Sequence, residues 1–385
     1  MASLRNKLKT MAALSADWNA PERTPAPPVA QGLSDETFPY PLSESLGNFS
    51  LADFETISPR LFFGLNDLPA RSFDPSRVVF LDTETTGLFG AAVQAFLVGV
   101  GYFSGDRFFV RQFLMRDLSA EEALLCALRD FLTAFDVIVT FNGKSFDVPL
   151  LETRMTFRRV EGRMPAAHID LIHPARRIYK LRIESCRLSN IEDKVFGAGR
   201  EDDIDGAEIP GRYFRFIRSG DESLLTDILA HNRRDIVTMP VLAAAMCRAL
   251  AAPEENSAPA DRFSIGRYYL RQKDAEAAQE YFSSVTEGLW SLPSLWQKSL
   301  LLKKNDPAAA AACWEEILSR TPDYCPAMIE LCKYHEHTTR DVERALSYCI
   351  LAQQTGMGRE KFAADLEKRQ ARLEKKRAQM QKKTR

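Results

Sequence analysis

Hydrophobic residues between about residues 76 and 250 form short runs that alternate with segments of helical periodicity. Runs rich in β-branched and aromatic residues are typical of strands, whereas apolar positions three and four apart are typical of helices. We expect strands at 77–81, 95–103, 107–114, 137–141 and 169–172. We expect helices at about 119–135, 148–158 and 224–250, the last of them kinked or restarted at Pro240. Because hairpin-like links join the first three strands and helices separate the others, the pattern predicts a mixed central sheet flanked by helices.

A second hydrophobic pattern repeats within residues 263–366. Asp274, Asp306 and Asp341 are 32 and 35 residues apart, and when they are aligned an alanine follows each of them four positions later. Bulky or sulfur-containing residues align seven and eight positions after the aspartates. These spacings bracket the period of about 34 residues that TPR units have, and the segment resembles three degenerate TPR helix pairs. An unrelated helical bundle is the alternative.

Composition marks the limits of these two domains. Residues 1–70 contain a proline-rich stretch and scattered aromatic residues, and we expect an irregular leader whose first fifteen residues can form a basic helix. The α/β domain then occupies 71–250, and a linker rich in alanine, proline and acidic residues follows at 251–262. Residues 367–385 form a basic tail with nine lysines and arginines against two glutamates.

The overall composition excludes several classes of protein. The chain has 45% apolar and 27% charged residues and a net charge of -1, which is typical of a globular protein rather than of a polycation. No apolar run approaches the ~20 residues that a membrane span needs. Seven cysteines without a C-x-x-C pair argue against a disulfide framework or a zinc site and fit a reducing compartment. We therefore expect a cytoplasmic protein that does not insert into membranes.

The first candidate for chemistry is Asp82-Thr83-Glu84, at the end of the first predicted strand. Side chains two positions apart on a strand point to the same face, so the two carboxylates converge there. A bound divalent cation would relieve their repulsion, and Gly87 lets the chain turn away. Two alternatives stay open for this segment alone: solvated acids at a strand end, and a phosphatase-type nucleophile motif, whose second acid is Asp rather than Glu.

Two further polar segments lie in similar settings. Asn142 and Asp147 follow the strand at 137–141, so Asp147 can face the same crevice, although an Asp at the start of a helix is most often an N-cap. His231 and Asp235 are four residues apart in the last helix and therefore share one face of it. Taken alone, such a pair is most often an ordinary surface pair.

Together, the three segments resemble the DEDD exonucleases of the ribonuclease-H-like fold. The patterns D-x-E, N-x-x-x-F-D and H-x-x-x-D follow one another in that order and in these secondary-structure settings. The similarity is closest to the YprB-type branch, in which such a domain precedes TPR units, and it covers about residues 75–365. It implies an α/β ribonuclease-H-like domain followed by an all-α TPR-like domain.

The resemblance also implies a two-metal nuclease. In this sequence the four acids that would hold two divalent cations, Mg²⁺ or Mn²⁺, are Asp82, Glu84, Asp147 and Asp235. His231 matches the general base, and its neutral imidazole would take a proton from the attacking water near neutral pH.

The position of the general base departs from the family pattern. In the His-type subgroup the His usually stands five residues before the last Asp, and in the Tyr-type subgroup a Tyr stands four residues before it. Here a His stands four residues before Asp235. Because four residues make about 400° of helix, His231 still shares the face of Asp235, and the choice of subgroup stays open.

A nuclease also needs residues that hold its substrate. Residues 154–187 carry nine basic groups against three acidic ones, which can hold phosphates, although a charged run is most often a solvated face. The acidic stretch 201–205 is expected to be a solvated loop. The resemblance assigns a backbone amide contact to Thr83 and a wedge against the terminal base to Leu88. The expected substrate-binding residues are Thr83, Leu88, Asn142, Arg176, Arg177 and Lys180.

These expectations combine into a cytoplasmic, metal-dependent 3′–5′ exonuclease that acts on DNA, with a TPR-like module that docks a protein partner. The resemblance suggests that the partner is a DNA helicase and that the setting is DNA repair. Two alternatives stay open: an exoribonuclease of the same fold, and a scaffold that binds nucleic acid without cutting it.

Overall fold

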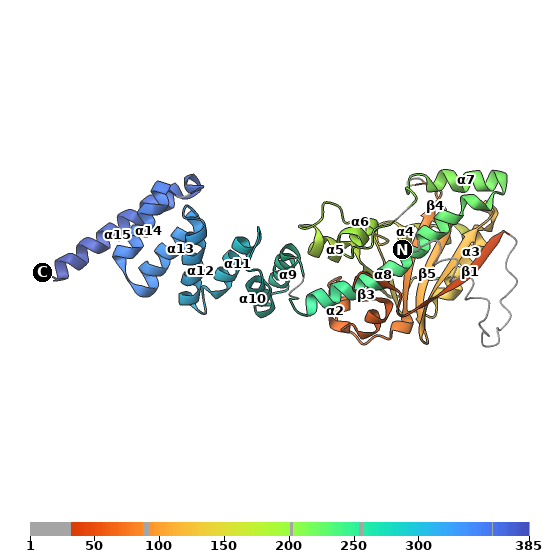
Figure 1. Ribbon diagram of the computed structural model, residues 1–385, viewed down its shortest axis with the longest axis horizontal. Coiled ribbons are helices and arrows are strands. Elements are labelled where there is room, and N and C mark those ends of the chain that lie inside the picture. The colour runs from red at the N-terminus through yellow and green to blue at the C-terminus, as the bar shows by residue number, and fades with distance from the viewer. Residues whose placement is uncertain (1–31, 88–91, 201–202, 254–256, 356, 385) are drawn as a thin grey trace.

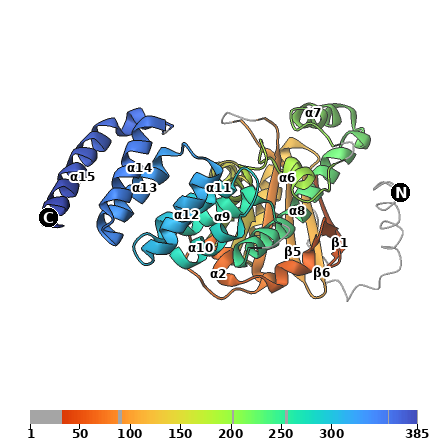
Figure 2. The same ribbon diagram turned by 60° about the vertical axis from the view of Figure 1, so that its left-hand side comes forward.

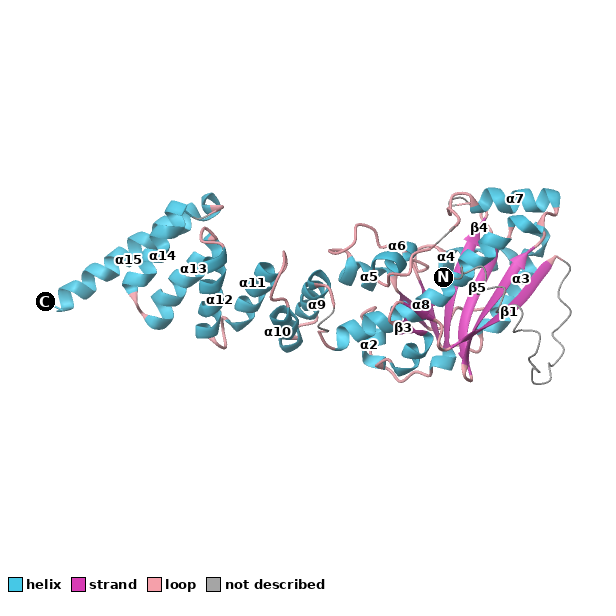
Figure 3. Ribbon diagram, in the orientation of Figure 1, coloured by secondary structure: helices cyan, strands magenta, loops and turns pink. Residues whose placement is uncertain are grey.

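The computed structural model describes residues 32–87, 92–200, 203–253, 257–355 and 357–384. Within them an α/β domain lies at one end of an elongated molecule and an array of helices at the other (Figure 1). Every strand of the described residues lies in the α/β domain (Figure 3). None of the described helices combines the length and the apolar character needed to cross a bilayer. The basic helix expected within residues 1–15 lies outside the described residues.

The α/β domain is built on a six-stranded sheet with the order β1-β6-β5-β4-β7-β8. The strands are β1 (Leu33–Pro41), β2 (Ser45–Leu46), β3 (Phe49–Ser50), β4 (Val78–Thr85), β5 (Ala95–Ser104), β6 (Arg107–Met115), β7 (Val137–Thr140) and β8 (Ala167–Asp170). β2 and β3 form a separate pair. β4 pairs antiparallel with β5 and parallel with β7, so the sheet changes direction at β4. The mixed sheet predicted from the sequence is thereby confirmed.

Helices cover both faces of this sheet. They are α2 (Pro59–Gly64), α3 (Glu121–Leu132), α4 (Asp147–Arg158), α5 (Ile172–Tyr179), α6 (Leu188–Lys194), α7 (Ile209–Ser219) and α8 (Thr226–Ala251). Val78 and Phe80 lie in one hydrophobic core with α5 and α8, whereas Val79 and Leu81 lie in a second core with α3 and α4. Burial on both faces explains why β4 and β7 read as continuous apolar runs rather than as alternating ones.

Helix α8 crosses the sheet in close contact with β5. A Cβ atom at Gly99 would lie 2.1 Å from Asn232 Oδ1, and one at Gly101 would lie 2.4 Å from Ile236 Cγ2. Both positions lie on one face of β5, and because both are glycine, α8 can pack this close to the strand. Pro240 lies inside α8, which continues as one helix to Ala251, so of the two alternatives, a kink or a restart at Pro240, the restart does not occur.

We expect Gly99→Ala to lower the free energy of unfolding by roughly 1–3 kcal/mol, the usual cost of overpacking a filled core. The added methyl group would collide with Asn232, whose side chain is completely buried. Urea unfolding followed by circular dichroism measures the change. The matched control is Gly211→Ala in α7, where an added Cβ meets nothing within 4 Å, and where alanine should stabilise the helix by roughly 0.5–1 kcal/mol. Unchanged stability of Gly99→Ala would contradict the close approach of α8.

From Gly32 onward, the structure differs from the irregular leader that was expected at 1–70. β1 pairs antiparallel with β6 at the edge of the sheet, and Arg111 donates to both carboxylate oxygens of Asp35 at 2.7 and 2.6 Å. Phe54 and Phe62, in a 3₁₀ turn and in α2, are fully buried in the α/β domain. Phe54 and Phe62 therefore belong to the core of the α/β domain rather than to an irregular leader.

The helical region consists of three helix pairs and a long last helix. Its helices are α9 (Pro259–Arg271), α10 (Ala275–Ser284), α11 (Ser291–Leu302), α12 (Pro307–Arg320), α13 (Cys325–Tyr334), α14 (Val342–Thr355) and α15 (Ala363–Thr384). Asp274, Asp306 and Asp341 each accept a hydrogen bond from the backbone amide three residues later, so each stands at the start of the second helix of its pair. The alanines that align with one another are fully buried, namely Ala278, Ala310 and Ala345.

The first helix pair is fixed to the α/β domain by polar contacts. Arg182 Nη2 pairs with Asp261 Oδ2 at 2.9 Å, the Tyr268 hydroxyl donates to the Gly64 carbonyl at 3.1 Å, and the Tyr281 hydroxyl donates to the Ala249 carbonyl at 2.6 Å. α9 begins at Pro259, inside the linker expected at 251–262. The array continues away from this contact, and α15 ends it (Figure 2).

The basic tail expected at 367–385 lies mostly within α15, and part of its charge is used internally. Glu336, whose side chain is completely buried, pairs with Arg369, Arg372 and Lys376. Although burial raises the pKa of Glu336, the hydrogen bonds from Arg372 and Lys376 lower it to about 2. These three basic side chains therefore anchor α15 to the preceding helix pair, which reduces what the tail can offer to phosphates.

Candidate active site

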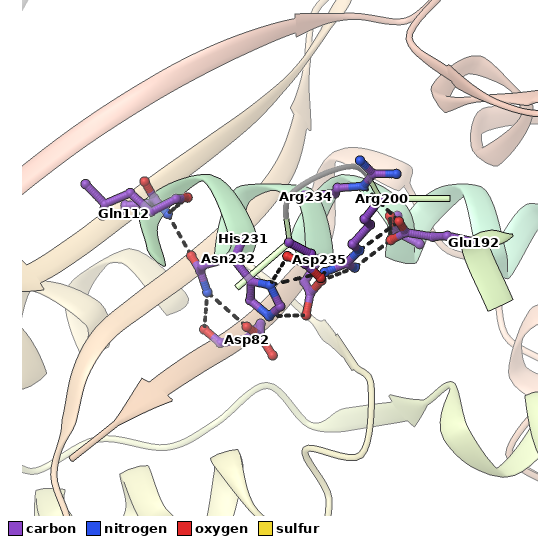
Figure 4. A network of polar contacts seen from close by, with 11 residues as sticks. Asp82, Gln112, Glu192, Arg200, His231, Asn232, Arg234 and Asp235 are labelled. Atoms are coloured by element: carbon purple, nitrogen blue, oxygen red, sulfur yellow. Dashed lines mark hydrogen bonds and ion pairs between the residues drawn. The ribbon is translucent and has the colours of Figure 1, made fainter. Parts of the chain in front are cut away.

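Asp82 and Glu84 lie at the carboxyl end of β4, on the face of the sheet that α8 covers. Side chains alternate along a strand, so both residues share the face of Phe80, which lies in the core beneath α8. Asn232 of α8 donates from Nδ2 to Asp82 Oδ2 at 2.9 Å (Figure 4). The convergence of the two carboxylates predicted from the D-x-E spacing thus occurs against a specific helix.

Asp147 reaches the same region from the neighbouring strand. β7 runs parallel to β4 and pairs with it from Val78 to Phe80, so the carboxyl ends of the two strands lie side by side. The loop after β7 then brings Asp147 to the first position of α4. There the Thr83 hydroxyl donates to Asp147 Oδ1, so the middle residue of the first motif contacts the acid of the second through its side chain.

The loop that precedes Asp147 is held in shape by Asp170 at the end of β8. The Asp170 carboxylate accepts hydrogen bonds from the backbone amides of Asn142 at 2.7 Å, Lys144 at 3.0 Å and Ile172 at 3.1 Å. Asn142 has a φ of 72°, a left-handed conformation that asparagine tolerates better than most residues. Asp170 and Asn142 therefore set the path of the chain into Asp147.

His231 and Asp235 complete the cluster from α8. His231 Nε2 lies 3.7 Å from Asp235 Oδ2, so the four-residue spacing places the two side chains on one face of the helix (Figure 4). Burial lowers the pKa of His231, but the carboxylates of Asp235, Asp203 and Glu84 outweigh it and raise the pKa above the usual value. This face of α8 lies over the carboxyl end of β4.

The acidic side chains of the cluster are partly buried and repel one another. Burial raises the pKa of Asp82 well above its usual value, and Asp235, Asp147 and Glu84 add to the rise. Burial likewise raises the pKa of Glu84 to about 8 and that of Asp147 to about 6. Burial also raises the pKa of Asp235, although Arg200 and His231 oppose the rise. Shifts in this direction mean that the negative charge of the cluster is poorly compensated.

A second polar network supports α8 from the side of α6. Glu192, whose side chain has no exposed surface, accepts hydrogen bonds from Arg200 at 2.9 and 2.6 Å, from Arg234 Nε at 2.8 Å and from the Thr238 hydroxyl at 2.7 Å. Arg200 also donates to Asp235 Oδ1. Figure 4 shows Arg200 between Glu192 and Asp235. The acid cluster and this network therefore share Asp235.

Sequence reasoning missed Asn232, which lies completely buried between the cluster and β6. Its Oδ1 accepts from Gln112 Nε2 at 2.8 Å while its Nδ2 donates to Asp82. The signal was present in the helical pattern: Ile228, Asn232 and Ile236 are four residues apart, so a polar side chain interrupts an apolar stripe. Arg200 and Asp203 were also missed, because the sequence around them reads as a solvated acidic loop.

The residues expected to bind the substrate fall into three groups. Thr83 and Asn142 adjoin the cluster, as described above, whereas Leu88 lies outside the described residues. Arg177 donates to the Leu65 carbonyl at 3.3 Å and to Asp67 at 3.2 Å, so it is used in a tertiary contact. Arg176 on α5 and Lys180 at the end of α5 are both exposed, and both lie near Cys186.

The basic cluster expected at 154–187 is partly used inside the α/β domain. Arg154 donates to both carboxylate oxygens of Glu121, and Arg158 Nε donates to Glu121 Oε2 at 2.5 Å. Arg182 pairs with Asp261, as noted above. These three arginines therefore stabilise the contacts of α3, α4 and α9, and the net charge of the segment overstates what faces a substrate.

Comparison with known proteins agrees with this geometry. Residues 79–247 match the RNase_H superfamily. YprB of Bacillus subtilis (strain 168), named as an uncharacterized protein, is 31% identical over 325 residues, which cover 80% of this chain and 77% of YprB. The chain belongs to the YprB family. Since the aligned 325 residues exceed the 169 residues between 79 and 247, the YprB similarity also extends beyond the superfamily domain.

Among solved structures, the family B DNA polymerase of Pyrobaculum calidifontis shares 16% identity with this YprB-family chain. The superposition has a TM-score of 0.37 and covers 59% of this chain and 30% of the polymerase. No conclusion about fold or function rests on a likeness at this level. The assignment to the RNase_H superfamily itself indicates a nuclease that acts on nucleic acid.

Nucleases of this superfamily generally use divalent metal ions, and the donor set of the YprB-family chain fits such ions. Four carboxylates offer the oxygen ligands that Mg²⁺ and Mn²⁺ prefer, and their raised pKa values indicate a need for positive charge. In the described part of the chain, however, no three His, Cys, Asp or Glu side chains already stand together as a metal site. Asp82, Asp147 and Asp235 are each bonded to a protein donor instead.

Proposed function

We propose that this chain is a metal-dependent 3′–5′ exonuclease that hydrolyses DNA phosphodiester bonds by a two-metal mechanism. The observation that supports the proposal is that four partly buried carboxylates from β4, α4 and α8 lie near His231, close enough for Asp235, Asp147 and Glu84 to raise the pKa of Asp82. An acid cluster of this kind is costly to fold without a bound cation, because its ionised carboxylates lose part of their contact with water and repel one another. Binding of divalent cations would account for the presence of this acid cluster.

In the proposal, Asp82, Glu84, Asp147 and Asp235 hold two divalent cations, Mg²⁺ or Mn²⁺. Such ions stabilise the negative charge that develops on the attacking and leaving oxygens of the phosphodiester. His231 accepts a proton from the attacking water, as a general base must lie within reach of the proton it removes. Asn232 keeps the Asp82 carboxylate turned towards α8 through its hydrogen bond.

The end of the substrate strand is proposed to lie over the loop 142–147. Thr83 and Asn142 adjoin the cluster, and Phe146, immediately before Asp147, is 51% exposed. An exposed aromatic ring can stack on a base without regard to sequence, which suits an enzyme that removes successive nucleotides. The 3′–5′ direction is taken from the resemblance to the DEDD exonucleases, as is the preference for DNA.

The helical region is proposed to act as a TPR-like docking module. Three helix pairs with equivalent capping aspartates are typical of such arrays. The resemblance to the YprB-type branch suggests a DNA helicase as the partner, DNA repair as the setting and the cytoplasm as the location. Attachment of α9 to the α/β domain would hold such a partner at a fixed position relative to the nuclease.

One observation favours a second candidate, a nucleic-acid-binding protein that does not cut. Arg200 donates to Asp235 and thereby supplies a cation from the chain itself. A protein that had given up catalysis would benefit from such internal compensation. An exoribonuclease of the same fold is a further alternative, which the choice of substrate tests.

The experiment incubates the purified full-length chain with single-stranded and duplex DNA and with matched RNA, each labelled once at the 3′ end and once at the 5′ end. We expect Mn²⁺-dependent release of the 3′ label from DNA, a ladder of shortened fragments from the 5′ label, and neither product in EDTA. Faster release from RNA would favour the exoribonuclease. Binding without any release would favour the non-cutting protein.

A further inference from the structure

Two residues between α6 and α7, Arg200 and Asp203, contact α8, although the sequence suggested that the acidic stretch 201–205 is a solvated loop. Arg200 is almost fully buried, with 4% of its side chain exposed, and Asp203 is partly covered at 26%. Both contact the helix at His231, the residue proposed as the general base. The function proposed above assigns no role to Asp203.

The ring of His231 is oriented by this segment. Its Nδ1 lies 2.7 Å from Asp203 Oδ1, and its Nε2 lies on the other side, 3.7 Å from Asp235 Oδ2. A carboxylate oxygen only accepts hydrogen bonds, so the short contact requires a proton on Nδ1. In the neutral ring the lone pair is then on Nε2 and is directed towards the acid cluster.

Arg200 fixes Asp203 in this position. Arg200 Nη1 lies 3.0 Å from Asp203 Oδ2 and 3.2 Å from His231 Nδ1. Since Nδ1 already carries a proton, the guanidinium cannot donate to it and donates to the carboxylate instead. The opposite edge of Arg200 is bound to Glu192 by two hydrogen bonds, so the donor that holds Asp203 is itself immobile.

We infer that Asp203 is the positioning residue of His231: it holds the proton on Nδ1, and thereby leaves Nε2 free to accept a proton, while Arg200 holds Asp203. The inference rests on the proposed function for its catalytic meaning, though not for the geometry of the ring. Carboxylate partners that orient a histidine in this way commonly determine which tautomer is present.

The proposed step balances as follows. The water oxygen forms a bond to phosphorus while the bond from phosphorus to the 3′ oxygen of the preceding nucleotide breaks. The proton of the water passes to His231 Nε2, and the leaving 3′ oxygen takes a proton from solvent. His231, now protonated on both nitrogens, keeps its hydrogen bond to Asp203 and then returns the Nε2 proton to solvent. Asp203 itself stays ionised throughout.

The test uses the full-length, metal-free chain labelled with ¹⁵N-histidine, at a pH where His231 is neutral. The chain has five histidines, and His231→Gln identifies the signal. We expect a protonated Nδ1 and an unprotonated Nε2 in the wild type. In Asp203→Asn the amide oxygen should turn to Arg200 and the amide nitrogen should donate to Nδ1, which moves the proton to Nε2. The kcat for DNA should fall by about 10–100-fold, with KM and the Mn²⁺ concentration for half-maximal rate unchanged.

Two further variants separate orientation from general damage. Asp203→Glu keeps the carboxylate and should retain the wild-type tautomer and part of the rate. Asp205→Asn is the matched control, because Asp205 is exposed in the same segment and its carboxylate accepts a hydrogen bond from the Ala207 amide at 3.0 Å, away from His231. It should change neither readout.

A wild-type His231 with its proton on Nε2, or the same tautomer in Asp203→Asn as in the wild type, would overturn the inference. A wild type without nuclease activity would refute the proposed function alone, because the tautomer measurement still decides whether Asp203 orients His231. A rate lost in Asp203→Asn without any change of tautomer would also count against the positioning role.

Discussion

The double variant Asp82→Asn, Glu84→Gln should lose nuclease activity by about 10³-fold or more, because removal of even one group that stabilises transition-state charge costs about 10²–10³-fold. It should at the same time be more stable than the wild type in metal-free buffer. Burial raises the pKa of Glu84 to about 8 and that of Asp82 well above its usual value, so both ionised groups are unfavourable in the folded chain. Neutral amides remove that cost, so the free energy of unfolding should rise by roughly 1–3 kcal/mol, which is less than the full pKa shift implies at about 1.4 kcal/mol per unit because both carboxylates are partly exposed and screened by solvent.

Two measurements check this prediction together. Release of the 3′ label with Mn²⁺ gives the activity, and thermal unfolding in EDTA gives the stability of the same preparations. Mn²⁺ should raise the unfolding temperature of the wild type, because an ion that binds only the folded state stabilises it by mass action, and it should not raise that of the double variant. Full activity in the double variant would place the active site elsewhere. A lower stability in EDTA would contradict the uncompensated charge.

Glu192→Ala should lower the free energy of unfolding by about 3–5 kcal/mol, the usual cost of leaving a buried charge without its partner. The change removes the fully buried carboxylate to which Arg200 and Arg234 both donate, and leaves Arg234 without an ion-pair partner among the described residues. Because Arg200 also contacts Asp203 and Asp235, the activity of the folded protein should fall by roughly 10–100-fold. Guanidinium unfolding and rates measured at a temperature where the variant is folded separate the two effects.

The chain provides a matched control in Glu121. It is 1% exposed and is also bonded to two arginines, Arg154 and Arg158, but it lies on α3 and contacts none of the four acids of the cluster. Glu121→Ala should destabilise the protein to a similar extent and leave the rate of the folded protein unchanged. Equal loss of activity in both variants would mean that the effect of Glu192 is general loosening rather than support of Asp235.

Much of the fold could be predicted because its central strands are buried on both faces. β5, β7 and the first half of β4 are largely apolar runs, which local sequence reveals directly. β1 was missed because it is an edge strand with two prolines, Pro39 and Pro41, and only one fully buried residue, Leu33. Its pairing with β6 joins residues that are far apart in the sequence, as in the contact of Arg111 with Asp35.

The candidate site likewise contains some residues that the sequence could suggest and others that it could not. The acids at 82, 84, 147 and 235 could be suggested from the sequence because each follows a strand or lies on a helical face whose direction is local information. Their role as metal ligands stays a prediction. Asp203 and Arg200 could not be found, because their contacts with His231 depend on how a loop folds back. Sequence also does not reveal that Arg177, expected to bind the substrate, pairs with Asp67, which is 110 residues away; its role in substrate binding stays a prediction.

The central claim is that the carboxylates of Asp82, Glu84, Asp147 and Asp235 hold divalent cations. Anomalous diffraction from crystals soaked in Mn²⁺, recorded at the manganese absorption edge, tests it most directly. We predict anomalous peaks enclosed by these four side chains in the wild type and their loss in the double variant Asp82→Asn, Glu84→Gln. Peaks found only elsewhere on the chain, or a wild-type cluster without bound manganese at saturating Mn²⁺, would contradict the account.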